Sequence, residues 1–250
     1  MILLVDIGNS RVKWSLLDAG ALLPQRAAAY AGWSVEDWRR ELFTDPGIRR
    51  VVAASVAGPQ GIEQLRAAAG AQPDCDLRVV TTSGTAGGVR NAYPEPRLLG
   101  IDRWLAVIAA HHLTGSGCCV VDVGTAATID AVAADGRHLG GYIVPGPRLM
   151  VASLLRGTSD LESHSAASAT DGSSLFANNK RDAIERGAVV TLASLADRSV
   201  QDLEHITGAA SSLLLTGGAA PLVLPHLRRA ARHIPDLVLR GLAVLAENGL

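Results

Sequence analysis

The chain has 250 residues, of which 48% are hydrophobic and 19% charged, and its formal net charge is −1. These values describe a globular protein of one large domain or two domains of about 100 to 150 residues. They exclude a disordered chain, and no global charge favours nucleic acid as a partner. Three cysteines, with Cys118 and Cys119 adjacent, exclude a disulfide framework and a zinc site, and indicate small core residues.

The apolar segments of the chain are all short. Only residues 1–5 precede the first acidic residue, which is too few for a signal peptide. No apolar run approaches the roughly 18 residues of a membrane span. We therefore expect a cytoplasmic protein that binds neither a membrane nor nucleic acid.

The first half of the chain alternates predicted strands and helices. Ser34 and Asp37 have the spacing of a capping box, which predicts a helix start. A loop rich in Gly, Asn and Pro follows at 83–100. The predicted strands cover residues 1–5, 12–17, 50–55 and 77–81, and the predicted helices cover residues 35–43, 59–69 and 102–113.

The second half begins after the break Thr114–Gly117, which predicts domains 1–115 and 116–250. The polar, Ser-rich stretch 163–174 is expected to be mobile. One apolar stripe at helical spacing indicates either core packing or a subunit contact: Ile184, Ala188, Leu192 and Leu195. The predicted strands cover 118–122, 126–133, 138–143 and 211–215, the first three antiparallel, and the predicted helices cover 148–155, 180–206, 219–233 and 239–247.

Two segments of the sequence match each other 116 positions apart. Residues 5–20 read VDIGNSRVKWSLLDAG, and residues 121–136 read VDVGTAATIDAVAADG. Both follow a largely apolar predicted strand and precede another strand. The match predicts a duplicated α/β unit, in which two lobes each offer an Asp-x-Gly turn to a cleft between them.

An Asp-x-Gly turn either caps a hairpin or binds phosphate. Glycine lets backbone N–H groups approach phosphate oxygens, and the carboxylates of Asp6 and Asp122 would hold a cation that bridges to them. Lys13 adds a positive charge and Thr125 a hydroxyl donor. Both turns together, with the glycines at 217–218, favour ligand binding. No GxxxxGK[ST] motif occurs, so the chain is not a P-loop protein.

A compact polar set begins the predicted helix after the long loop. Asp102 is either a helix-start acid favoured by the helix dipole or the acceptor of a proton from an attacking hydroxyl. Arg103 is either a surface cation or the partner of a substrate carboxylate. Long loops often line sites, and this set suits phosphoryl transfer to an alcohol.

These motifs resemble the type III pantothenate kinases of the actin-like ATPase and sugar kinase superfamily. The resemblance rests on DIGNSRVK (6–13), Tyr93, GIDRW (100–104) and VDVGTAATIDAV…GGYIVPG (121–146). It implies an α/β fold of two duplicated ribonuclease H-like lobes with a cleft between them. It also implies ATP-dependent phosphorylation of pantothenate, the first step of coenzyme A biosynthesis, by a homodimer that uses Mg²⁺ with ATP and a monovalent cation, K⁺ or NH₄⁺.

The resemblance also implies roles for individual residues. Asp102 would be the general base, Asp122 would bind the monovalent cation, and Asp6 would hold Mg²⁺ through water. The implied ATP-binding residues are Asp6, Ile7, Gly8, Asn9, Ser10, Arg11, Val12, Lys13, Thr125, Gly217 and Gly218. The implied pantothenate-binding residues are Tyr93, Gly100, Ile101, Asp102, Arg103 and Lys180.

The sequence departs from the family pattern at two places. The family's FGxNT motif reads FANNK at 176–180, so either Lys180 or Asn179 takes the substrate contact of the usual Thr. Glu162 stands where relatives usually show Pro. Two alternative functions stay open: a non-catalytic nucleotide-binding regulator of the same fold, and a kinase for another small hydroxy-acid or a sugar.

Overall fold

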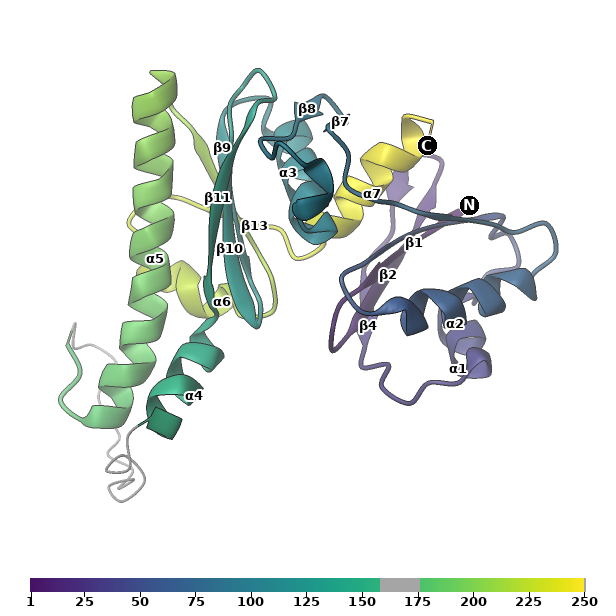
Figure 1. Ribbon diagram of the computed structural model, residues 1–250, viewed down its shortest axis with the longest axis horizontal. Coiled ribbons are helices and arrows are strands. Elements are labelled where there is room, and N and C mark those ends of the chain that lie inside the picture. The colour runs from purple at the N-terminus through teal and green to yellow at the C-terminus, as the bar shows by residue number, and fades with distance from the viewer. Residues whose placement is uncertain (158–175, 250) are drawn as a thin grey trace. The chain divides into compact units, whose positions relative to one another are not determined.

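The computed structural model describes residues 1–157 and 176–249, and the chain divides into two compact units (Figure 1). Unit 1 comprises residues 1–115, 135–138 and 236–249, and unit 2 comprises 116–134 and the described part of 139–235. The Ser-rich stretch 163–174, expected to be mobile, lies outside the described residues. In the part of the chain that is described, no helix has the length and apolar character to cross a membrane.

The sheet of unit 1 is built around a buried apolar strand at the N-terminus. Its strands are β1 (Ile2–Ile7), β2 (Val12–Asp18), β3 (Ala21–Leu22), β4 (Arg26–Ala28), β5 (Arg50–Ser55) and β6 (Asp76–Val79). Their order is β3-β2-β1-β5-β6, with β4 also paired to β2. Strand β1 runs antiparallel to β2 and parallel to β5. The short strands β3 and β4 were not predicted from the sequence.

Helices cover both faces of this sheet. Helices α1 (Val35–Leu42) and α2 (Pro59–Gly70) share a core with one set of alternate side chains of β1, including Leu3 and Val5. Helix α7 (Leu237–Glu247) contacts β1, β2 and β5 and packs against α3 (Ile101–Thr114). The C-terminal helix therefore belongs to unit 1, which corrects its assignment to the second lobe.

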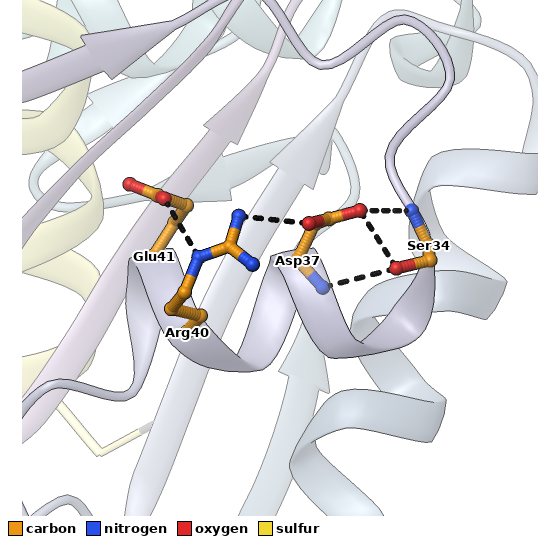
Figure 2. Close-up of polar contacts among 4 residues, drawn as sticks. All are labelled: Ser34, Asp37, Arg40 and Glu41. Carbon is orange, nitrogen blue, oxygen red and sulfur yellow. Dashed lines mark hydrogen bonds and ion pairs between the residues drawn. The ribbon is translucent and has the colours of Figure 1, made fainter.

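Figure 2 shows how α1 begins. The Asp37 N–H donates to Ser34 Oγ at 3.2 Å, and Asp37 Oδ2 accepts the Ser34 N–H at 2.8 Å, so the predicted capping box is confirmed. Arg40 donates to Asp37 at 2.8 Å. The hydrogen bonds from Ser34, followed by that from Arg40, hold the pKa of the Asp37 carboxyl below its ordinary value.

Helix α7 approaches α3 closely at Gly241. A methyl group there would lie 2.7 Å from the Leu105 carbonyl carbon and would also overlap the Leu105 oxygen. We expect Gly241→Ala to lower the free energy of unfolding by about 1–3 kcal/mol, because overpacking forces the two helices apart. The helical glycine Gly70, with nothing near its ideal Cβ position, provides the control variant Gly70→Ala. Equal melting temperatures for the two variants would contradict the close packing.

The sheet of unit 2 repeats the topology of unit 1. Its strands are β9 (Cys118–Val123), β10 (Ala126–Val132), β11 (His138–Pro145), β12 (Ser212–Thr216) and β13 (Arg232–His233). Their order is β11-β10-β9-β12-β13, so the first strand again lies between the antiparallel second strand and a later, parallel strand, which is β12 here and β5 in unit 1. Cys118 and Cys119 are buried in the core, and neither forms a disulfide, as predicted.

The register of the two sheets places the two acidic turns at equivalent points. Asp6 lies opposite Lys13 on β2, and Asp122 lies opposite Thr128 on β10. On the parallel side, Asp6 pairs with Ala54 and Asp122 with a residue of β12. Because the second turn is one residue shorter, its strand partner comes six positions after the aspartate and not seven. The ungapped sequence match therefore ends at the turns, whereas the topology continues through both sheets.

Helices α4 (Pro147–Gly157) and α5 (Lys180–Thr207) pack together in unit 2. The α5 side chains Leu192 and Leu203 are buried in a core with β9, β10 and β12, and Leu195 packs against it. Core packing is therefore the role of Leu192 and Leu195, two of the four residues of the predicted stripe. Its first member, Ile184, is half-buried and lines a groove with α4.

The predicted helix at 219–233 is wrong. The segment forms the short helix α6 (Ala220–Val223), the 3₁₀ turn Leu224–His226 and the edge strand β13. Pro225 cannot continue α6, because it lacks the N–H donor that a helix needs. The Asp197 carboxylate then accepts the N–H groups of Arg228 (2.9 Å) and Arg229 (3.2 Å). This contact with α5 fixes an extended path that the local sequence does not reveal.

The predicted loop at 83–100 contains regular structure. Strands β7 (Thr85–Ala86) and β8 (Val89–Arg90) form a small hairpin, and the 3₁₀ turn Pro96–Leu98 follows. Thr82 Oγ1 donates to the Leu99 carbonyl at 2.8 Å and closes the segment on itself. The loop thus leads directly into α3.

Candidate active site

The first acidic turn joins β1 to β2. Asp6 is 7% exposed at the end of β1, and the Gly8 N–H donates to the Arg11 carbonyl at 3.0 Å. Asn9 and Ser10 are exposed at the tip. Lys13 is half-buried directly across from Asp6, so both side chains leave the same face of the sheet. A carboxylate, a cation and exposed polar groups therefore meet at one strand end.

A tyrosine outside the turn holds its backbone. The Tyr30 hydroxyl donates to the Gly8 carbonyl at 2.8 Å, and its ring meets the Trp38 ring edge-on at 5.6 Å. Trp38 is fully buried. The tyrosine therefore ties the exposed turn to the core of unit 1. Sequence reasoning missed this residue, because no local pattern marks it.

The second acidic turn joins β9 to β10 in unit 2. The Gly124 N–H donates to the Ala126 carbonyl at 3.0 Å, and Thr125 is exposed. The Thr125 carbonyl accepts the Gly146 N–H at 2.8 Å. A methyl group at Gly146 would lie 2.7 Å from that same carbonyl oxygen and would overlap Gly124, so only glycine fits here. Gly146 is the last residue of the GGYIVPG motif, and this motif is the feature of the sequence by which Gly146 could have been identified.

Gly217 lies against the second turn from the end of β12. Its φ is +91°, and a methyl group there would lie 2.6 Å from the Val123 nitrogen and would overlap the Asp122 carboxylate. The Ala219 N–H also donates to the Val123 carbonyl at 2.9 Å. The structure therefore brings Asp122 and Gly217 together, as two of the predicted ligand-binding residues.

Asp102 lies in the first turn of α3, whose N-cap is Gly100. Its Oδ1 accepts the N–H of Arg103 at 2.8 Å, and a methyl group at Gly100 would lie 2.7 Å from that oxygen. Among residues 1–157 and 176–249, no other group is hydrogen-bonded to this carboxylate. The carboxylate is half-buried, so it is fixed by the backbone and still accessible to a proton donor.

Arg103 and Tyr93 form a pair beside Asp102. The Arg103 side chain is buried, at 5% exposure, and its Nη1 donates to the Tyr93 hydroxyl at 3.1 Å. The guanidinium carbon lies 5.9 Å from the centre of the Tyr93 ring. A buried guanidinium oriented by a tyrosine presents donors in a fixed geometry, which suits recognition of a carboxylate.

The predicted site residues fall into both units. Unit 1 holds Asp6 to Lys13, Tyr93 and Gly100 to Arg103, whereas unit 2 holds Asp122, Thr125, Gly217, Gly218 and Lys180.

Lys180 begins α5 and is exposed. The neighbouring Asn179 is the helix N-cap, and both of its polar side-chain atoms bond Asp182 at 3.0 Å. Because both polar atoms of the Asn179 side chain are used in the helix cap, Lys180 is favoured over Asn179 as the residue that contacts the substrate.

The residues present fit a cation that arrives with a nucleotide. No group of three or more His, Cys, Asp or Glu side chains in the described ranges could hold a metal ion by itself. Each acidic turn instead offers one carboxylate beside backbone and hydroxyl donors. Mg²⁺ typically binds one or two carboxylates together with waters and substrate phosphates, so this donor set matches it.

Comparisons with known proteins agree on one family. The model of the type III pantothenate kinase family matches residues 2–202. A type III pantothenate kinase from Nitrosococcus oceani is 38% identical over 254 residues, covering 99% of this chain and 94% of the relative. The chain belongs to the type III pantothenate kinase family. The resemblance inferred from its motifs is confirmed, and the family implies ATP with a divalent metal.

Solved structures support the fold of this family member. A protein from Campylobacter jejuni, described as a Baf family transcriptional activator, is 23% identical with a TM-score of 0.56 over 98% of both chains. A protein from Sinorhizobium meliloti, described as a 2-dehydro-3-deoxygalactonokinase, is 19% identical with a TM-score of 0.54 over 99% of both chains. Such likenesses show the fold alone, which is the two-lobed α/β fold of the actin-like ATPases and sugar kinases.

Proposed function

We propose that this chain transfers the γ-phosphoryl group of ATP to the terminal hydroxyl of pantothenate, the first step of coenzyme A biosynthesis. The observation that carries the proposal is the start of α3, in a chain of the type III pantothenate kinase family. There, a half-buried carboxylate at Asp102 adjoins the buried Arg103, which donates to the half-buried Tyr93. A proton acceptor beside a carboxylate binder suits a substrate that has both a hydroxyl and a carboxylate.

Residues of both acidic turns bind ATP in this proposal. Backbone N–H groups and polar side chains at Gly8–Lys13 contact phosphate oxygens, and the Lys13 ammonium neutralises their charge. Thr125 adds a hydroxyl donor, and the glycines at 217–218 accept the adenosine at close range. These contacts position the γ-phosphate, which is most of what an enzyme does in phosphoryl transfer.

Residues of α3 and its preceding loop bind the acceptor. Arg103, oriented by Tyr93, binds the pantothenate carboxylate through charge-assisted hydrogen bonds. Gly100 and Ile101 let the substrate lie against the start of the helix. The Asp102 carboxylate takes the proton from the attacking hydroxyl as the oxygen–phosphorus bond forms.

Two cations complete the proposal. Asp6 holds Mg²⁺ through water, and Mg²⁺ supplies charge neutralisation at the phosphates when it is bound. Asp122, enclosed by Gly217, binds a monovalent cation, K⁺ or NH₄⁺. A turnover that requires both ions would support these assignments, and unchanged turnover after removal of K⁺ and NH₄⁺ would contradict the second.

We further propose that the enzyme is a cytoplasmic homodimer with α4 and α5 at the subunit contact. Exposed apolar side chains on these helices support this, among them Leu154 (51% exposed) and Val190 (45%). A groove of about 510 Å³ between the helices is lined by Met150, Leu154 and Ile184, among others. A monomeric mass in sedimentation would contradict the dimer.

In the same proposal, Lys180 at the start of α5 reaches the substrate carboxylate.

Acceptor-dependent ADP release tests the function directly. Purified protein with ATP, Mg²⁺ and K⁺ should release ADP only when pantothenate is added, as followed by a coupled assay. A panel of other hydroxy-acids and sugars tests the acceptor. Release with another acceptor alone would assign a different kinase. ATP binding in calorimetry without any acceptor-dependent turnover would favour a nucleotide-binding regulator of the same fold.

The Tyr30 hydroxyl should matter for ATP and not for pantothenate. Because Tyr30→Phe removes the hydrogen bond to the Gly8 carbonyl, we expect the KM for ATP to rise roughly 2- to 10-fold, the range of one net hydrogen bond. The half-exposed Tyr142 on β11 provides the control Tyr142→Phe, which should leave the KM for ATP unchanged. A rise in the KM for pantothenate alone would show that Tyr30 does not act through the phosphate turn.

A further inference from the structure

The turn between β10 and β11 belongs to unit 1, although it connects two strands of the unit 2 sheet. Residues 135–138 are grouped with unit 1, whereas the residues on either side of them are grouped with unit 2. The Gly136 carbonyl accepts the Arg90 N–H at 2.8 Å. A methyl group at Gly136 would overlap the Gly88 oxygen, so the turn and the 88–92 segment approach as closely as backbones can. This contact fixes the position of His138, the first residue of β11.

His138 is buried against the loop that precedes α3. Its side chain is 3% exposed, and its Nδ1 accepts the Ala92 N–H at 3.4 Å. The ring is nearly parallel to that of Tyr93, with an angle of 10° and a centroid distance of 6.4 Å. This geometry is an offset stack.

The stack continues a chain of contacts that ends at the proposed substrate-binding group. Tyr93 accepts a hydrogen bond from Arg103 at 3.1 Å through its hydroxyl, and its N–H donates to Asn91 Oδ1 at 2.9 Å. The backbone hydrogen bond fixes the position of the Tyr93 main chain. The position of its hydroxyl depends on the contacts of its ring. Among the described residues, His138 stacks on this ring and the Arg103 guanidinium lies over it.

We propose that His138 is a positioning residue for the acceptor site: it holds the Tyr93 ring so that the tyrosine hydroxyl orients Arg103 toward the carboxylate of the acceptor. The inference rests on the proposed function. His138 does not touch the substrate itself, so its effect appears in acceptor affinity and not in nucleotide affinity. The aromatic ring is the essential feature, since the stack depends on it.

Two substitutions of His138 distinguish the effect of its aromatic ring from the effect of its nitrogen acceptor. His138→Leu keeps apolar volume in the buried site and removes the ring, and His138→Phe keeps the ring and removes the nitrogen acceptor. We expect the leucine variant to raise the KM for pantothenate roughly 2- to 12-fold, the range for one aromatic pair, with an unchanged KM for ATP. The phenylalanine variant should restore most of the loss. Should the leucine variant fail to fold, His138→Gln serves in its place.

A control and a double variant exclude a purely structural effect. His112 is exposed on α3 and contacts the Gly87 carbonyl at 3.1 Å, so His112→Ala should leave the KM for pantothenate unchanged. In a Tyr93→Leu background, His138→Leu should add no further rise, because both changes break one chain of contacts.

Three outcomes would overturn the proposal: an unchanged KM for pantothenate in the leucine variant, additive effects in the double variant, or equal losses in the leucine and phenylalanine variants. Absence of pantothenate-dependent ADP release in the unmodified protein is a different result. That result would contradict the proposed function, whereas an active protein with an insensitive His138 would contradict only this inference.

Discussion

Asp102→Asn should lower kcat roughly 10²- to 10⁴-fold, as expected for the loss of a general base. This corresponds to about 2.7–5.5 kcal/mol of transition-state stabilisation. Asparagine has the same shape and retains an oxygen that can accept the Arg103 N–H, so the start of α3 stays intact. The KM for ATP should not change, because the proposed site places this residue against the acceptor and not the nucleotide.

The measurement is steady-state ADP release as a function of each substrate. Asp76 on β6 is exposed and bonds Arg78 at 3.1 Å, and Asp76→Asn gives a matched control that should keep full turnover. Near-native turnover of Asp102→Asn, with an unchanged melting temperature, would show that the proton leaves by another route. The base assignment would then be wrong even if the enzyme is a pantothenate kinase.

Gly217→Ala should weaken ATP binding by about tenfold or more. A side chain at its φ of +91° costs about 1–2 kcal/mol of backbone strain. The new methyl group would also overlap the Asp122 carboxylate and lie 2.6 Å from the Val123 nitrogen, so the second turn must move. Each 1.4 kcal/mol lost from binding is a factor of ten in affinity.

Calorimetric titration with ATP measures this effect without catalysis. Gly208 provides the matched control, since its φ is +70° but nothing lies near its ideal Cβ position. Gly208→Ala carries similar backbone strain at the C-cap of α5 and should lower stability while leaving ATP affinity unchanged. If both variants bind ATP equally well, Gly217 does not shape the nucleotide site.

Much of the fold could be predicted because short-range patterns determine its strands and turns. Apolar runs bounded by Asp-x-Gly turns marked β1 and β9, and the matching segments indicated a duplicated α/β unit, which agrees with the shared strand order. The element against which a helix packs could not be predicted in this way. The apolar face of α7 indicates that the helix is buried, but nothing in residues 237–247 indicates that it packs on α3 in unit 1.

The failure at 219–233 has a related cause. The segment contains good helix formers, but Pro225 ends α6, and Asp197 on the distant α5 binds two consecutive backbone N–H groups beyond it. A propensity argument considers neighbours in sequence, whereas this path depends on a contact made more than 30 positions away.

At the candidate site, too, contacts between residues far apart in the sequence could not be predicted. Residues whose chemistry suits phosphates or carboxylates, such as Lys13, Asp102 and Arg103, could be selected by type and spacing. Residues that orient them could not. Tyr30 acts on a turn 22 positions away, and His138 acts on a loop 46 positions away, so neither belongs to a local motif.

Transfer of labelled phosphate tests the central claim most directly. Purified protein would be incubated with ATP labelled at the γ-phosphorus, Mg²⁺, K⁺ and pantothenate, and the labelled products separated. We predict that the label appears in phosphopantothenate, at a rate that falls at least roughly 10²-fold in Asp102→Asn. Label that appears only in inorganic phosphate, or remains in ATP, would contradict the assignment of this chain as a pantothenate kinase.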